Sequence, residues 1–353
     1  MSGGVDSSVA AALLKRAGFN IQGVFMRFWS EGGGDRQNKC CSSEAEDRAR
    51  QVAQKLGIPF YVFNFKSEFK KRVVDYFLRE YKAGRTPNPC VVCNKEIKFG
   101  LLMEKALALG ADYIATGHYA RLKAIKNYSK LLAIARSLEW KLLRGKDPAK
   151  DQSYFLWQLK QRQLKHILFP VGDYTKKEVR AMAEEFGLPT AQTKESQEIC
   201  FVEKTLNEFL QRHLKTKPGP IIDEVGKEIG QHKGLWFYTI GQRKGIELVG
   251  IAPYYVVSKD IKKNCLVVSQ ERKDLDKKEL LVKKINWLTG KEPELPLKVK
   301  AQIRYWTPAA TARVERGKGG YRVVFSKPQR AITPGQSVVL YRGEELLGGG
   351  IIE

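Results

Sequence analysis

The sequence predicts an α/β domain built on a parallel sheet, followed by a small central β-rich module and a C-terminal β-barrel. The first half alternates short apolar runs with capped amphipathic stretches, a pattern typical of βαβ units. From Pro218 onward the pattern changes to short alternating runs separated by Gly and Pro turns, which favours all-β modules. A length of 353 residues allows two or three separate cores. We therefore expect domains at 1–205, 206–278 and 279–353.

The apolar periodicity and the capping residues predict the N-terminal elements in order. A helix is expected at 7–17, ended by Gly18, and a buried strand at 21–29. Ser43 and Glu46 are spaced as a capping box that opens a helix ending at Leu56. The following elements are a strand at 60–65, helices at 67–81 and 95–109, and a strand at 111–116. Ligands of such sheets bind at the carboxyl ends of the strands, so the loops there are candidate site segments.

Beyond residue 120 the helical pattern is expected to continue through 151–157. Thr175 and Glu178 form a second capping box, which opens a helix to about Phe186. Short strands are then expected at 234–240, 254–257, 265–268, 299–305, 310–314, 320–325 and 337–341. Their even spacing predicts a barrel at the C-terminus.

The first eight residues, Met1-Ser2-Gly3-Gly4-Val5-Asp6-Ser7-Ser8, have the composition of a phosphate-binding loop at the start of a helix. Asp6 suits a Mg²⁺ ion, although a plain turn with Asp6 as helix N-cap fits the same residues. The string resembles the pyrophosphatase-type P-loop of adenylating enzymes and lacks the lysine of the kinase-type loop. Such loops follow a strand, and only Met1 precedes Ser2, so we expect a short strand ahead of the given sequence.

The composition indicates a polyanionic partner. Sixty-two Lys and Arg against 38 Asp and Glu give a net charge of +24. No apolar run reaches the length of a membrane span, and the phosphate loop stands where a leader peptide would be. We therefore expect a cytoplasmic protein without a membrane partner. Six cysteines in such a chain favour thiol chemistry or metal binding over a disulfide framework.

Three hypotheses fit Cys90-Val-Val-Cys93, which we expect in a Pro-rich loop before a helix, together with the distant Cys200. Cys93 and Cys200 form a catalytic pair in which one cysteine carries a persulfide and the other releases its sulfur through thiol exchange. Alternatively, Cys90, Cys93 and Cys200 ligate an Fe–S cluster with one open iron. In the third hypothesis all three cysteines are buried structural residues. Cys40-Cys41 is expected to pack or cap, and Cys265 to lie in the core.

Several motifs in order extend the resemblance over essentially the whole chain. Besides Ser2 to Ser8 they are Gly84-Arg-Thr-Pro-Asn-Pro, Cys93-Asn-Lys-Glu-Ile-Lys-Phe99, Thr116-Gly-His-Tyr-Ala-Arg121, Lys150-Asp-Gln-Ser-Tyr154, Gln197-Glu-Ile-Cys200-Phe and Tyr238-Thr-Ile-Gly-Gln-Arg243. With these motifs the chain resembles bacterial tRNA-specific 2-thiouridylases, the MnmA family of the PP-loop ATP pyrophosphatase superfamily. The resemblance implies an adenine nucleotide alpha hydrolase-like fold for the first domain.

The resemblance implies that ATP, with Mg²⁺, adenylates O2 of wobble uridine 34 in tRNA, and that persulfide sulfur then displaces AMP. Carried over by position, the ATP contacts fall on Ser2, Gly3, Gly4, Val5, Asp6, Ser7, Ser8, Met26 and Gly117. The nucleophile falls on Cys93 and the persulfide on Cys200. The tRNA contacts fall on Asn88, Pro89, Cys90, His118, Lys150, Asp151, Gln152, Arg304, Tyr305 and Gln336. The implied partners are tRNAs for Lys, Glu and Gln and a sulfur donor such as a cysteine desulfurase or sulfur-relay protein.

One departure from the family pattern concerns Cys90, where many members carry Asp as an acid, base or cluster ligand. A thiol there favours metal or disulfide chemistry, so a [4Fe–4S] cluster competes with the persulfide scheme. Taken alone, His118 is also compatible with a turn residue that bonds its own backbone, and Arg304 and Tyr305 with an ordinary cross-strand pair. The alternative functions are a P-loop pyrophosphatase ligase for a small molecule and a non-catalytic tRNA-binding protein.

Overall fold

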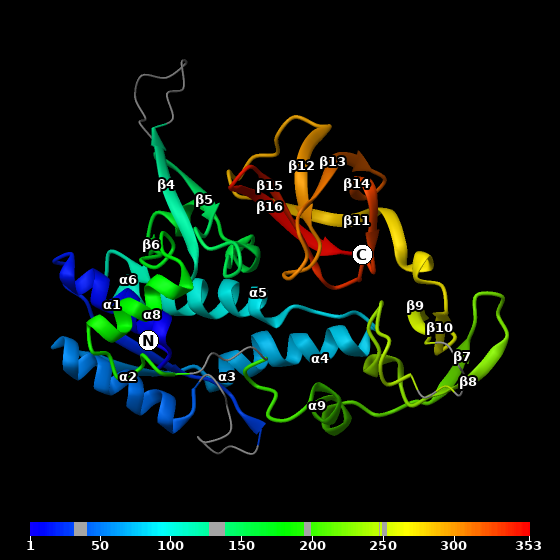
Figure 1. The fold of residues 1–353 in the computed structure, drawn as a ribbon, viewed down its shortest axis with the longest axis horizontal. Helices are drawn as coiled ribbons and strands as arrows, with labels where there is room; N and C mark the ends of the chain where they lie inside the picture. Colours follow the sequence, from blue (N-terminus) through cyan, green and yellow to red (C-terminus); the bar gives the residue numbers. More distant parts are fainter. Residues whose placement is uncertain (32–40, 127–137, 194–198, 247, 249–252) are drawn as a thin grey trace.

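The structure is a computed structural model that describes residues 1–31, 41–126, 138–193, 199–246, 248 and 253–353 (Figure 1). In the view of Figure 1 most helices of the N-terminal domain lie at the left and along the bottom, and the C-terminal barrel lies above them to the right of the centre. The small central module lies at the far right (Figure 1). Among the described residues, no helix is long and apolar enough to cross a membrane.

The N-terminal domain is α/β, as predicted. Strand β1 pairs in parallel with β2, and β3 pairs in parallel with β6, as two separate pairs within the described residues. The amino group of Met1 donates to the carbonyl of Val24 in β1. The elements are α1 (Val5–Arg16), β1 (Gly23–Arg27), α2 (Ser43–Leu56), β2 (Phe60–Asn64), α3 (Lys66–Phe69), a π-helical stretch (Lys70–Val74), α4 (Asp75–Lys82), α5 (Pro89–Cys93), a second π-helical stretch (Asn94–Leu102), α6 (Met103–Ala108), β3 (Ile114–Ala115), β4 (Ala120–Lys126), β5 (Leu138–Arg144), a 3₁₀ turn (Ser153–Leu156), α7 (Gln161–Leu164), β6 (Ile167–Leu168), α8 (Lys176–Glu185) and α9 (Leu206–His213).

The Cys-x-x-Cys segment was predicted to lie in a loop before a helix. This prediction is wrong, because the segment forms the first turn of the helix α5. Pro89 occupies the first turn, and the Asn88 side chain accepts hydrogen bonds from the N–H groups of Cys90 and Val91 at 3.2 and 3.4 Å. This cap and the Pro-compatible first turn start the helix six residues earlier than the apolar periodicity indicates.

Two further expectations about helices have different outcomes. The N-cap of α2 is Ser42 and not Ser43, because the Ser42 hydroxyl accepts from the N–H of Ala45 while Glu46 pairs with Arg27. The capping box at Thr175 and Glu178 is confirmed, with the reciprocal bonds at 3.3 and 2.6 Å.

The helix expected beyond residue 120 is wrong. The chain there forms the antiparallel hairpin β4–β5, and Ser153–Leu156 is only a 3₁₀ turn. Strand β5 pairs with β16 of the C-terminal barrel through Leu142 and Leu346. Pairing with β4 and β16 gives the backbone N–H and C=O groups of β5 hydrogen-bond partners that are distant in the sequence, so a local pattern does not predict this strand.

The central module is a small sheet in the order β8-β7-β10-β9. Its strands are β7 (Gly219–Ile222), β8 (Glu228–His232), β9 (Tyr255–Asp260) and β10 (Cys265–Ser269). Cys265 is buried in β10, as expected, and Cys41 is buried with its sulfur 3.2 Å from the N–H of Phe28. Cys40 lies outside the described residues. The strand expected at 234–240 is instead a 3₁₀ turn at Leu235–Phe237.

The C-terminal module is a closed barrel, as predicted. The strand order is β11-β14-β13-β12-β15-β16, and β16 returns to pair with β11. The strands are β11 (Asp276–Trp287), β12 (Leu297–Gln302), β13 (Ala310–Gly317), β14 (Gly320–Arg330), β15 (Ser337–Arg342) and β16 (Glu345–Ile352). Inward residues such as Val299, Val314 and Val323 are buried and alternate with exposed ones, which produced the sequence pattern. Strand β12 ends at Gln302, so Arg304 and Tyr305 are not a cross-strand pair.

Candidate functional site

The predicted phosphate loop forms the turn that leads into α1. Gly3 has a positive φ of 69°, and a Cβ there would lie 2.2 Å from the carbonyl oxygen of Ala45 in α2. A Cβ at Gly117 would lie 2.6 Å from the carbonyl carbon of Asp6. Gly117 therefore lies directly against the loop, and both close approaches of backbone require glycine.

Serine hydroxyls hold the shape of the loop. The Ser7 hydroxyl accepts from the N–H of Ser2 at 3.1 Å and donates to the carbonyl of Gly4 at 3.1 Å. The Ser8 hydroxyl donates to the same carbonyl at 2.9 Å. The N-cap is Gly4 and not Asp6, so no side chain caps the first turn of α1. The first N–H groups and the positive end of the helix dipole suit a phosphate.

Asp6 is held by two side chains from distant parts of the chain. Its Oδ1 accepts from the hydroxyl of Tyr119 and from Nζ of Lys176, both at 2.7 Å. Among the residues that the structure describes, Oδ2 accepts no hydrogen bond. The loop carboxylate is thus oriented through one oxygen.

Sequence reasoning missed Tyr119 and Lys176 as partners of Asp6. The capping box did place Lys176 at the first position of α8, and Tyr119 lies two residues after Gly117. What the sequence lacked was the packing of α8 on α1, in which Val179 and Val9 share one apolar cluster.

Met26 and two of the three candidate cysteines lie at the edge of one apolar cluster. Met26 is in β1, Cys93 ends α5, and Cys200 follows the segment after α8. All three are partly buried and pack against a core that contains Phe69, Phe77, Phe201 and Phe209. The structure thus brings Cys93 and Cys200, which are 107 positions apart (200 − 93), to the same core.

Cys90 is exposed in the first turn of α5. Cys90, Cys93 and Cys200 are all among the described residues, and among those residues no group of three His, Cys, Asp or Glu side chains could hold a metal ion. As placed, the three cysteines do not fit an Fe–S cluster.

Gln336 ties the barrel to the loop that precedes α5. Its Nε2 donates to the carbonyl oxygens of Thr86 and Pro87 at 2.7 and 3.4 Å. The N–H of Thr86 donates to the carbonyl of Pro334 at 2.9 Å. Gln336 is therefore linked to the segment containing Asn88, Pro89 and Cys90.

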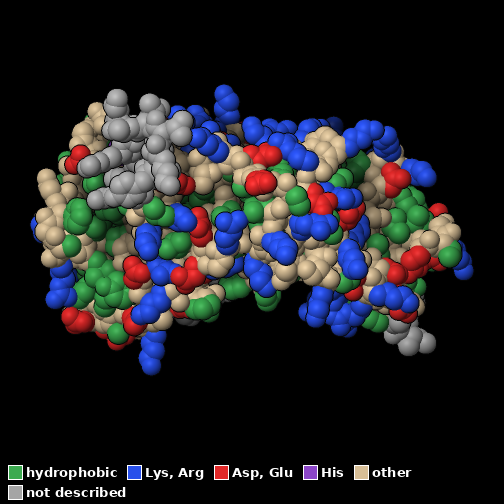
Figure 2. Space-filling model, turned by 90° about the horizontal axis from the view of Figure 1, so that it is seen from above, with side chains coloured by type: hydrophobic (Ala, Val, Ile, Leu, Met, Phe, Trp, Pro, Cys, Tyr) green, Lys and Arg blue, Asp and Glu red, His purple; other side chains and the backbone are tan. Residues whose placement is uncertain are grey.

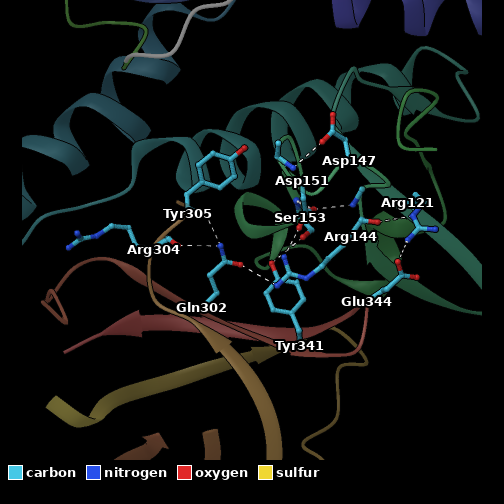
Figure 3. Close-up of polar contacts among 12 residues, drawn as sticks. Arg121, Arg144, Asp147, Asp151, Ser153, Gln302, Arg304, Tyr305, Tyr341 and Glu344 are labelled. Carbon is cyan, nitrogen blue, oxygen red and sulfur yellow. Dashed lines mark hydrogen bonds and ion pairs between the residues drawn. The ribbon is translucent and has the colours of Figure 1, made fainter. Parts of the chain in front are cut away.

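The segment Lys150 to Gln152 is anchored at the junction of the N-terminal domain with the barrel. Asp151 is buried and pairs with Arg144 at 2.7 Å, while the Gln152 side chain accepts from the N–H of Tyr119 at 3.1 Å. Arg144 also donates to Gln302 at 3.3 Å and lies 3.6 Å above the ring of Tyr341 (Figure 3). Lys150 is partly exposed.

Arg304 and Tyr305 lie on the barrel side of this junction (Figure 3). Gln302 donates to the carbonyl of Tyr305 at 2.8 Å, and the Tyr305 ring lies 4.5 Å from that of Phe155. Arg304 donates to the hydroxyl of Thr333 at 3.1 Å. The structure thus brings Tyr305 of the barrel against Phe155, which lies three residues after Gln152 in the N-terminal domain.

His118 is buried between Phe99 and Phe169, with ring centroids 5.9 and 6.0 Å away. Its Nδ1 bonds the hydroxyl of Thr116 at 2.8 Å, not its own backbone. Burial, with a smaller contribution from Lys98, holds the pKa of His118 well below its usual value. The imidazole is therefore neutral near pH 7 and acts through hydrogen bonding or packing.

Lys and Arg side chains spread over the face seen in Figure 2, with fewer acidic ones among them. In the barrel the exposed lysines include Lys277, Lys278, Lys283, Lys284, Lys298 and Lys300. Such a surface suits phosphate backbones.

Comparisons with known proteins cover the whole chain. Family models match residues 1–204 (tRNA methyl transferase HUP domain), 207–270 (tRNA methyl transferase PRC-barrel domain) and 277–352 (aminomethyltransferase beta-barrel domain). The tRNA-specific 2-thiouridylase MnmA of Moorella thermoacetica is 49% identical over 100% of this chain and 98% of its own length. Relatives of the same name from a Roseiflexus species and from Carboxydothermus hydrogenoformans are 47% and 48% identical, over 100% of this chain and 97% and 96% of theirs. The chain belongs to the MnmA family of tRNA-specific 2-thiouridylases.

Proposed function

We propose that this chain is an ATP-dependent tRNA sulfurtransferase that replaces O2 of wobble uridine 34 by sulfur. The observation that carries the proposal is the full-length match, at 49% identity, to proteins named tRNA-specific 2-thiouridylase. The N-terminal domain also contains the predicted phosphate loop at the start of α1, which suits ATP. In the same domain Cys93 and Cys200 pack at one apolar core, and their thiols suit sulfur transfer.

In the first step O2 of the uracil attacks the α-phosphorus of ATP, the bond from this phosphorus to the oxygen that bridges to the β-phosphate breaks, and pyrophosphate leaves. The N3 proton of the uracil passes to water in this step. The N–H groups at the start of α1 bind the phosphates, the Ser7 and Ser8 hydroxyls hold the shape of the loop, and Gly117 leaves room beside it. Asp6 fits Mg²⁺, because a carboxylate held through Oδ1 leaves Oδ2 for the ion or its water. When bound, Mg²⁺ offsets the charge of the phosphates.

In the second step sulfur replaces the adenylated oxygen. Cys200 carries a persulfide, and the thiolate of Cys93 attacks the inner sulfur of Cys200. The terminal sulfur leaves as hydrosulfide, adds to C2 of the uracil and displaces AMP, so a disulfide joins Cys93 and Cys200. A cellular thiol then reduces this disulfide, and a sulfur donor restores the persulfide. The packing of both cysteines at one core supports this scheme.

The candidate tRNA residues divide into two groups. Asp151 and His118 are buried, and the Gln152 side chain accepts from the N–H of Tyr119, the partner of Asp6, so we propose that these three residues position the site. We propose that Asn88 to Cys90, Lys150, Arg304, Tyr305 and Gln336 line the path of the anticodon region. Arg304 and Lys150 suit phosphates, and Tyr305 suits stacking on an extruded base.

We further propose that the substrates are tRNAs for Lys, Glu and Gln, and that a cysteine desulfurase or sulfur-relay protein supplies the sulfur. The reaction would take place in the cytoplasm. We propose that the catalytic domain comprises residues 1–205. The two β modules that bind the tRNA backbone would comprise residues 206–278 and 279–353.

The test supplies purified protein with ATP, Mg²⁺, a low-molecular-weight persulfide and unmodified tRNA transcript, and measures AMP and nucleosides by mass spectrometry. Cys93→Ser and Cys200→Ser are expected to abolish thiolation, whereas Cys265→Ala, a change in a buried strand remote in sequence, retains it. Formation of neither AMP nor 2-thiouridine by the unaltered chain would refute the function. Iron counting on anaerobically purified, active protein separates the persulfide scheme from a [4Fe–4S] cluster.

A further inference from the structure

We propose that Lys176 binds the β- and γ-phosphates of ATP and the departing pyrophosphate. In this way α8 supplies the cation that the phosphate loop itself lacks. The inference rests on the proposed use of ATP and adds a catalytic residue to that site.

The first argument is the position of the ammonium group. Nζ of Lys176 lies 2.7 Å from Oδ1 of Asp6, the second residue of α1. Its side chain is only 11% exposed, and the nitrogen lies 5.8 Å above the ring of Tyr119. A buried lysine stem that ends at the loop carboxylate places a positive charge beside the start of α1.

The second argument is that the backbone of Lys176 is fixed from two sides. Thr175 caps α8 in the box with Glu178, and the N–H of Lys176 donates to Oδ2 of Asp147 at 2.9 Å. Helix α8 also packs on α1 through the cluster that contains Val9 and Val179. The packing therefore fixes the start of α8 relative to the start of α1, and this fixes the distance from Lys176 to the loop.

The third argument is electrostatic. The stretch Ser2 to Ser8 contains Asp6 and no lysine, so its only charged side chain repels a triphosphate. Pairing with Lys176 offsets that repulsion. An ammonium carries three N–H donors, so a bond to Asp6 is compatible with bonds from the same nitrogen to phosphate oxygens. Charge that develops on the leaving pyrophosphate is stabilised by such a preplaced cation.

A purely structural ion pair between Asp6 and Lys176 makes a different prediction from a phosphate contact. If the pair serves only the fold, loss of either partner should disturb the site in the same way. If Lys176 binds phosphate, loss of Lys176 weakens pyrophosphate binding, whereas loss of the Asp6 charge does not.

The experiment measures the dissociation constants of ATP, inorganic pyrophosphate and AMP by isothermal titration calorimetry without Mg²⁺. Lys176→Gln is expected to bind ATP and pyrophosphate about 10- to 100-fold more weakly, the range for charge-assisted hydrogen bonds. AMP lacks the two outer phosphates, so its affinity should change less than about threefold, well below the factor of one such bond. Lys177→Gln is the matched control, because the adjacent Lys177 is exposed. It should behave like the unaltered chain.

A pair of variants keeps the test valid if Lys176→Gln alone fails to fold. Asp6→Asn and the double variant Asp6→Asn/Lys176→Gln both lack the ion pair, and they differ only in the lysine charge. The double variant should again bind pyrophosphate about 10-fold more weakly than Asp6→Asn. Equal affinities of these two variants, or an equal loss for AMP and ATP in Lys176→Gln, would overturn the inference. If the unaltered chain binds neither ATP nor pyrophosphate, the proposed function fails instead.

Discussion

Replacing Arg144 by leucine tests whether the junction between the N-terminal domain and the barrel depends on one buried ion pair. The Asp151 carboxylate is 5% exposed and lies 2.7 Å from the Arg144 guanidinium, which is 27% exposed. The same guanidinium donates to Gln302 at 3.3 Å and stacks 3.6 Å above the ring of Tyr341 (Figure 3). A leucine side chain at this position would keep part of the packing and lose all of the charge.

Removing one partner of a buried pair costs about 3–5 kcal/mol, because the other charge is left buried. Here the N–H groups of Gly145 and Ser153 still donate to Asp151, both at 3.0 Å, and Arg144 is partly solvated. We therefore expect a smaller loss of unfolding free energy, about 2–3 kcal/mol, just below that range. In urea unfolding followed by circular dichroism, this corresponds to a midpoint lowered by about 1 M for a slope of about 2–3 kcal/mol per M.

The matched control is Arg16→Leu, which removes an arginine whose ion pair with Glu185 has both side chains more than 60% exposed, at 63% and 66%. Its loss of unfolding free energy should stay near or below about 1 kcal/mol, because the ion pair is exposed and the other contact of the guanidinium is an exposed one with the ring of Phe186, 4.6 Å away. Adding Asp151→Asn to Arg144→Leu should recover part of the stability, since the uncompensated charge disappears. The reasoning is refuted if Arg144→Leu and Arg16→Leu unfold at the same urea concentration.

Three further outcomes are expected. Gly117→Ala should weaken ATP binding about tenfold in calorimetry, because the added Cβ would lie 2.6 Å from the Asp6 backbone and overpacking costs about 1–3 kcal/mol. The control is Gly317→Ala, whose Cβ would lie 3.7 Å from its nearest neighbour. Equal ATP affinities of the two variants would contradict the close approach at Gly117. Burial lowers the pKa of His118 from 6.5, so the unfolded chain binds more protons and stability falls as the pH drops below 6.5. His118→Gln should remove up to about 1.4 kcal/mol per pH unit of that slope in urea unfolding, and an unchanged slope argues against a neutral buried imidazole. Raising the salt concentration should weaken tRNA binding in fluorescence anisotropy by a similar factor for different tRNAs, because phosphate contacts release counterions, and a salt-independent affinity would contradict a phosphate grip.

Local patterns in the sequence were sufficient for several parts of the fold. The alternation of apolar and polar residues predicted the barrel strands β12, β13 and β14, in which buried and exposed residues alternate. The spacing of Thr175 and Glu178 predicted the start of α8. The Ser-Gly-Gly string predicted a turn that leads into a helix, and the structure places Gly3 there with a positive φ of 69° ahead of α1. These features depend on hydrogen bonds and side-chain periodicity within a few residues, so they can be read from the chain.

Other features could not be read from any local window. The hairpin β4–β5 replaces an expected helix because β5 pairs with β16, about two hundred residues further along the chain (346 − 142 = 204). The helix at Cys90 begins early because Asn88 caps it, although periodicity placed the start at about residue 95.

The sequence by itself determined the kinds of groups present: a glycine-rich phosphate loop, a set of cysteines, a strongly basic surface and three domains of known type. Only the tertiary structure decided which groups meet: Lys176 with Asp6, Arg144 with Asp151 and Tyr341, and Cys93 with Cys200 at one core. The reason is physical. Propensity and capping act between neighbours in the chain, whereas contacts between distant residues form only where packed helices and paired strands bring them together.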